Sequence, residues 1–162
     1  MTNKVIHIKF PGIQNKGLKI NLTHSKIIIE ATAFIFILLF IYTGTSKILN
    51  FSVFKGQLST SPVLSSLSTH IAWVVPISEF IISLLLIVPK WRVIGFAATC
   101  IIMTLFTTYI IFILNYNEHL PCSCGGILEL LSWKQHLSVN AALILLASFG
   151  FFLQRKLSHF TF

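Results

Sequence analysis

The sequence predicts an all-α fold, an integral membrane four-helix antiparallel bundle. The chain is 55% hydrophobic and only 10% charged over its 162 residues, and its mean hydropathy of +0.86 lies outside the range of soluble domains. Four apolar segments each reach the roughly 20 residues that a membrane-spanning helix needs. Only residues 89–92 join the second segment to the third, so these two segments must run antiparallel.

The first 26 residues are expected to form a basic cytoplasmic tail. They carry five lysines and no acidic residue: Lys4, Lys9, Lys16, Lys19 and Lys26. The apolar run that follows is too long for a signal peptide and has no small-residue cleavage site, so the tail is expected to remain attached. Residues 5–10 have the composition of a strand, but we identify no second segment to complete a sheet. The positive charge favours lipid headgroup contact over nucleic-acid binding.

The membrane domain is predicted to span residues 27–153, with helices at about 27–49, 67–88, 93–115 and 133–153 and a short cytoplasmic tail at 154–162. Pro76 lies inside the second helix and is expected to kink it. The first connection, about 50–66, is rich in serine, and the last, about 117–132, contains two cysteines.

The distribution of lysine and arginine predicts the orientation in a bacterial inner membrane. The tail lysines, Lys90, Arg92, Arg155 and Lys156 lie on one side of the predicted bundle, whereas Lys47, Lys55 and Lys134 lie on the other. Positive flanks stay in the cytoplasm. We therefore expect both termini to be cytoplasmic and the cysteine loop to be periplasmic, where disulfides form and persist.

Cys122 and Cys124 are the main candidates for chemistry. They are separated by one residue and flanked by Pro121 and the Gly125-Gly126 pair, which supply turning backbone. A disulfide in so small a ring would be strained and easily reduced. The sequence leaves open which cysteine is the nucleophile, although the Gly125-Gly126 amides favour Cys124.

His136 is predicted to lie in the first full turn of the fourth helix, which opens with the capping-box spacing Ser132-x-x-Gln135. Asn140 follows on the same face. An imidazole just below the cysteine loop can stabilise a thiolate or relay a proton. The alternative is an interfacial histidine that contacts headgroups or backbone.

Glu79 and Lys47 are charged residues that lie inside predicted membrane-spanning helices, where a charge is unfavourable. A carboxylate near the middle of the bilayer costs a few kcal/mol or more unless it is paired or neutral, so Glu79 is either functional or hydrogen-bonded between helices, for example to Lys47. Lys47 either extends its amine to the outer interface, pairs with Glu79, or holds a thiolate or a quinone oxygen. Gly44 is a candidate dimer contact, with packing inside the chain as the alternative.

No metal site is predicted, although Cys122, Cys124, His119 and His136 offer donors, because their spacing matches no common zinc pattern. Cys100 is interpreted as a small packed hydrophobe, too far from the loop to join the pair.

The combination of Gly44-x-x-Lys47, Pro76-x-x-Glu79 and Pro121-Cys-x-Cys-Gly-Gly126 resembles the MauE/DoxX family of redox-associated membrane proteins, most closely its MauE branch. The likeness covers about residues 27–153. It implies a four-helix membrane protein in which Cys122 and Cys124 form a redox pair. The MauE branch is associated with disulfide maturation of periplasmic enzymes beside a thioredoxin-like partner, and the DoxX branch with electron transfer to quinone. Ser83 stands where relatives often have glycine, and the basic tail has no counterpart in the family pattern.

We therefore expect thiol–disulfide exchange or electron transfer at the outer membrane face, in support of disulfide maturation of periplasmic proteins. The expected partners are the lipid bilayer and a periplasmic thioredoxin-like or disulfide-containing protein. A membrane quinone is a candidate cofactor near Glu79, Lys47 and Asn140. The alternatives are a non-enzymatic scaffold with a structural disulfide and a small proton-coupled transporter that uses Glu79. Whether the chain is itself an enzyme stays open, as does homo-oligomerisation.

Overall fold

The computed structural model describes residues 5–8, 18–61, 64–116 and 133–159. Its elements, in chain order, are β1 (Val5–Ile8), β2 (Leu18–Asn21), α1 (Leu22–Leu49), α2 (Phe51–Thr60), a 3-10 turn (Ser65–Leu67), α3 (Ser68–Ile87), α4 (Arg92–Tyr116) and α5 (Trp133–His159). Four helices, α1, α3, α4 and α5, are long and apolar enough to cross a membrane. The predicted all-α membrane fold class is confirmed.

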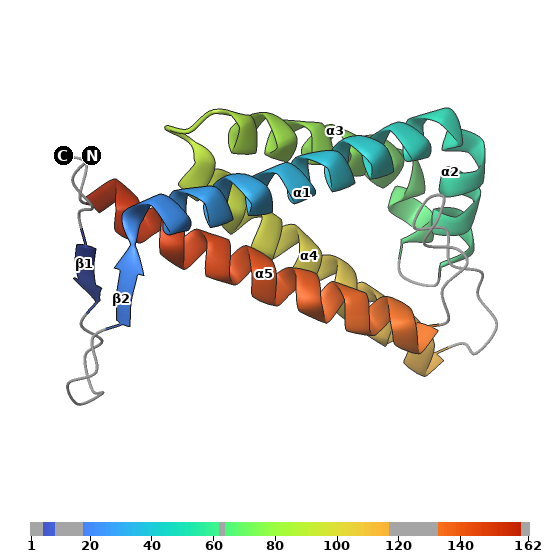
Figure 1. The fold of residues 1–162 in the computed structure, drawn as a ribbon. Helices are drawn as coiled ribbons and strands as arrows, with labels where there is room; N and C mark the ends of the chain where they lie inside the picture. The colour runs from blue at the N-terminus through green and yellow to red at the C-terminus, as the bar shows by residue number, and fades with distance from the viewer. Residues whose placement is uncertain (1–4, 9–17, 62–63, 117–132, 160–162) are drawn as a thin grey trace.

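The four long helices form a closed ring. The most extensive contacts are those of α1 with α3 and of α4 with α5, while smaller contacts between α3 and α4 and between α1 and α5 complete the ring. Successive long helices run in opposite directions (Figure 1), so α2, the first turn of α3 and the first turn of α5 lie at the same end of the bundle, here called the α2 end. The start of α1 and the last turns of α5 lie at the opposite end.

The helix ends deviate from the expected spans mainly at the end opposite α2. There α1 begins at Leu22, inside the predicted tail, and α5 continues to His159, through most of the predicted C-terminal tail. The ends of α3 and α4 differ from the predicted ones by a single residue. Helix α3 continues through Pro76, which is buried. The predicted spans followed the apolar runs only. Helix formation does not require apolar residues, so the helices continue through flanking polar residues such as Ser25.

The first connection contains a helix that the sequence analysis did not predict. Serine and Gly56 lower the intrinsic helix propensity of this segment, but packing compensates. Phe51 lies against Trp73 of α3, with ring centroids 4.8 Å apart, and Leu58 is buried. The hydroxyls of Ser59 and Thr60 donate to carbonyls three residues earlier, which satisfies them locally. Tertiary contact with α3 therefore overrides the local composition.

The expectation that residues 5–10 lack a strand partner is wrong. Strand β1 pairs antiparallel with β2, in a register that sets Ile6 opposite Ile20 and Ile8 opposite Leu18. Leu18–Asn21 lies within the residues that were predicted to form a basic tail, on the basis of their lysines. The hairpin precedes the membrane helices and leaves the fold class unchanged.

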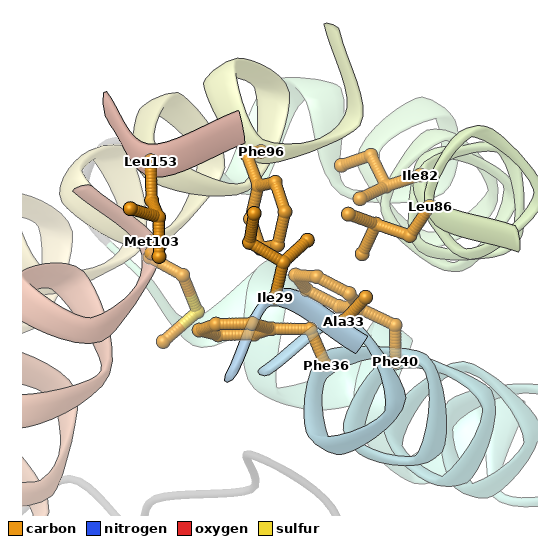
Figure 2. Close-up of a cluster of buried hydrophobic side chains, with 10 residues drawn as sticks. Ile29, Ala33, Phe36, Phe40, Ile82, Leu86, Phe96, Met103 and Leu153 are labelled. Atoms are coloured by element: carbon orange, nitrogen blue, oxygen red, sulfur yellow. The ribbon is translucent and has the colours of Figure 1, made fainter. Parts of the chain in front are cut away.

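The apolar core fills the half of the bundle away from α2. All four long helices contribute to it (Figure 2), and its buried members are Ile29, Ala33, Phe36 and Phe40 of α1, Ile82 and Leu86 of α3, Phe96 and Met103 of α4, and Ala147 and Leu153 of α5. Phe96 is fully buried and packs against Gly150, where a Cβ would lie 2.7 Å from its ring. This close contact brings α4 and α5 together.

Candidate functional site

A buried ion pair joins α1 to α3. Lys47 Nζ lies 2.7 Å from Glu79 Oε1, and their side chains are only 4% and 10% exposed. Lys47 also donates to the Thr43 carbonyl at 3.5 Å. The two charges stabilise each other where each alone would be costly to bury. Of the readings that the sequence left open for Lys47, the structure shows the pair with Glu79 and not an amine extended to the interface.

Gly44 allows α3 to approach the end of α1. A Cβ at this position would lie 3.3 Å from Glu79 Oε2 and 3.3 Å from the Phe80 ring. Gly44 therefore packs against α3 of the same chain. This is the alternative that the sequence offered to a dimer contact. Ser83, one turn beyond Glu79, donates to the Glu79 carbonyl at 3.0 Å and takes no part in the ion pair. The serine is accommodated within α3.

Helix α2 lies next to the ion pair. Asn50, between α1 and α2, bonds back to the Ser46 carbonyl through both its backbone and its side chain. The turn at Asn50 carries the Phe54 ring to 6.0 Å from Lys47 Nζ, within reach of a cation–π interaction. An aromatic ring and a carboxylate therefore flank the lysine amine.

His136 and Asn140 occupy the same buried face at the start of α5, as their spacing predicted. They are 2% and 4% exposed. The His136 ring lies near Phe106 of α4, with centroids 6.5 Å apart. Neither ring nitrogen of His136 has a hydrogen-bond partner, and the same holds for Asn140 Nδ2 and Glu79 Oε2. Polar atoms thus remain free for a ligand, for water or for proton transfer.

Cys122 and Cys124 lie outside the described residues, as does Ser132, the predicted helix cap. Helix α5 begins at Trp133, where the capping box predicted it. Cys100 is half-buried in α4 and lies 3.7 Å from the Ser148 hydroxyl. Within the described ranges no cluster of three or more histidine, cysteine or acidic residues could hold a metal ion.

A second ion pair, between Arg92 and Glu30, was missed by sequence reasoning. Arg92 Nη1 lies 2.6 Å from Glu30 Oε1, and Arg92 Nε donates to the Leu86 carbonyl at 3.0 Å. Arg92 was counted only as a topology signal. The sequence did contain a signal for this pair: Glu30 is an acid inside the first apolar run, and Arg92 lies at the same end of the predicted bundle.

Four apolar helices around a buried ion pair define a multi-pass membrane protein. A family model described as "Methylamine utilisation protein MauE" matches residues 25–153, and the chain therefore belongs to the MauE family. The match begins two residues before the end of the predicted tail, so nearly all of the tail lies outside the matched region, as expected. Searches of curated proteins and of solved structures gave no match.

Proposed function

We propose that this protein exchanges thiols and disulfides at the outer face of a bacterial inner membrane, through Cys122 and Cys124, in support of disulfide formation in periplasmic proteins. Two findings support the proposal. The family match includes the cysteine loop. The observation that carries it is His136, a buried imidazole without a hydrogen-bond partner, one turn into the helix that follows this loop.

The exchange step moves two electrons and two protons. A thiolate of the periplasmic client attacks the Cys122–Cys124 disulfide and forms a mixed disulfide, while one cysteine of the pair leaves as a thiolate. The second client thiol then attacks the mixed disulfide. The client leaves with a disulfide, and Cys122 and Cys124 become a dithiol after taking up two protons. His136 is the proposed stabiliser of the thiolate that leaves or attacks.

Regeneration of the pair needs an acceptor of two electrons and two protons. A thiolate of the reduced pair attacks the disulfide of a thioredoxin-like partner, and its neighbour resolves the mixed disulfide, so that the partner becomes a dithiol. A membrane quinone, which would become the quinol, is the other candidate. Asn140 Nδ2 is an available donor for a quinone carbonyl, whereas the amine of Lys47 is already paired with Glu79.

The test replaces each cysteine of the pair. Cys122→Ser and Cys124→Ser should each abolish oxidation of a periplasmic reporter protein, and one of the two should accumulate a mixed disulfide that reducing agent dissolves. Cys100→Ser is the matched control, because Cys100 lies in α4 and is expected to leave exchange unchanged. Normal reporter oxidation in both single variants would exclude the proposed function.

The two alternatives give different results in the same strains. A scaffold would keep its function with the pair permanently oxidised. A proton-coupled transporter would survive loss of both thiols and fail on Glu79→Gln, because the buried Glu79 carboxylate is its only proposed proton site.

A further inference from the structure

The buried core of the bundle changes from apolar to polar along its length. Its apolar cluster stops at Phe40 in α1, at Ile82 in α3, at Met103 in α4 and at Ala147 in α5. Beyond that level, toward α2, the buried face carries Thr43 and Lys47 in α1, Glu79 in α3, and His136 and Asn140 in α5. We call these five residues the polar half. Ala72 and Ile110 are also buried toward α2 but do not join the apolar cluster.

The two halves also differ in how their polar atoms are satisfied. In the apolar half Ser83 donates to the Glu79 carbonyl, Thr99 donates to the Gly95 carbonyl, and Arg92 has two acceptors. Among the described residues, the buried side-chain atoms without a partner all lie toward α2: Ser61 Oγ, Glu79 Oε2, both ring nitrogens of His136, and Asn140 Nδ2. Leaving one such atom unsatisfied costs about 1–3 kcal/mol.

We propose that water enters the polar half from the α2 end and hydrates the inner face of α5 and the Glu79 carboxylate. The free atoms include an acceptor, Glu79 Oε2, a donor, Asn140 Nδ2, and an imidazole that offers one of each. Water satisfies both kinds, and buried waters make two to four bonds to such groups. An apolar ligand satisfies neither.

The position of the apolar cluster supports entry from this end. The apolar cluster, with Phe36 and Phe96 fully buried, closes the opposite half. Water would therefore reach Glu79 from one side only, and this carboxylate would exchange protons with the solution at the α2 end.

Thiol accessibility tests this inference independently of the proposed redox function. In a chain with Cys100, Cys122 and Cys124 replaced by serine, Thr43→Cys and Asn140→Cys probe the polar half. Ala33→Cys and Ala147→Cys are matched controls, since both positions are buried on the same two helices within the apolar cluster. A membrane-impermeant methanethiosulfonate should modify the first two at least about tenfold faster than the controls, because a thiolate, which attacks the reagent's sulfur and expels sulfinate, forms far more readily in contact with water. Equal, slow modification of all four would overturn the inference.

A second measurement uses the natural chain and does not depend on the size of the reagent. X-ray hydroxyl-radical footprinting oxidises side chains that lie beside bound water. His136 should be oxidised faster than Met103, although methionine sulfur is intrinsically easily oxidised and both residues are buried. Oxidation of Met103 with protection of His136 would contradict a hydrated polar half.

Discussion

The side chains of Lys47 and Glu79 show how this chain accommodates charge in an apolar bundle. Each partner lies on a core-facing position, and each is expensive to bury alone. Their short contact of 2.7 Å makes the pair a unit. Removal of one partner therefore leaves an uncompensated buried charge, whereas removal of both leaves no buried charge at this site.

A double-mutant cycle should show this dependence. Lys47→Met and Glu79→Gln should each destabilise the protein by about 3 kcal/mol, and the double variant by clearly less than the sum. The measurement is thermal or denaturant unfolding of the purified protein in detergent. Strictly additive single effects would show that the two side chains do not interact in the membrane protein.

Three glycines provide a graded test of helix packing. Gly150→Ala places a Cβ 2.7 Å from the buried Phe96 ring and should cost about 1–3 kcal/mol, whereas Gly44→Ala meets Glu79 and Phe80 at 3.3 Å and should cost less. Gly56→Ala is the control, because its Cβ would meet no atom within 4 Å apart from the neighbouring residues and the backbone of α2 itself; it should stabilise α2 by about 0.5–1 kcal/mol. The same unfolding assay should give this order; a destabilising Gly56→Ala would contradict it.

Sequence reasoning identified four of the five residues of the polar half, because each stands out against an apolar segment; it did not single out Thr43. Spacing placed His136 and Asn140 on one face, and in the structure both are buried at the start of α5. The choice between an extended and a paired Lys47 depended on a contact 32 positions away in the sequence, which spacing within one helix does not encode. The Glu30–Arg92 pair was missed for the same reason.

At the scale of elements, the Arg92 side chain stabilises the tight turn between α3 and α4. Its guanidinium joins the C-terminal carbonyl of α3 at Leu86 to Glu30 of α1, so one side chain connects three helices. Val88 has an extended backbone before Pro89, which ends α3. The local sequence thus predicted the turn, and the arginine adds a tertiary link.

The two partners of this ion pair should not contribute equally. Arg92→Gln removes a buried group with two acceptors and should destabilise the protein by about 2 kcal/mol. Glu30→Gln should cost less than about 1 kcal/mol, since the Glu30 side chain is 64% exposed. Unfolding of the two purified variants compares them; equal losses would contradict this account.

The long helices were predictable and the short elements were not. Segments of about 20 apolar residues have few alternatives to a spanning helix. Helix α2 depends on Phe51 meeting Trp73, and β1 depends on its pairing with β2. Both are contacts between segments, which override weak local preferences. Propensity alone therefore misjudged residues 51–60 and 18–21.

At the scale of the whole molecule, the positive-inside bias predicts that α2 faces the periplasm. Cysteines introduced at two exposed positions test this in intact cells, in a chain free of other cysteines. Ser52→Cys, in α2, should react with an impermeant maleimide, and Lys90→Cys, in the α3–α4 turn, should react only after the cells are opened. The reverse pattern would place the cysteine loop in the reducing cytoplasm and remove the basis for the proposed exchange.

The measurement that tests the central proposal most directly is the redox state of Cys122 and Cys124 in membranes, read by alkylation mass shift across a graded dithiothreitol series. An exchanger must cycle between dithiol and disulfide. Its midpoint should therefore lie well above about −300 mV, the region below which structural disulfides usually lie. A pair that stays oxidised throughout the series would contradict the proposal and identify the disulfide as a structural link in a scaffold.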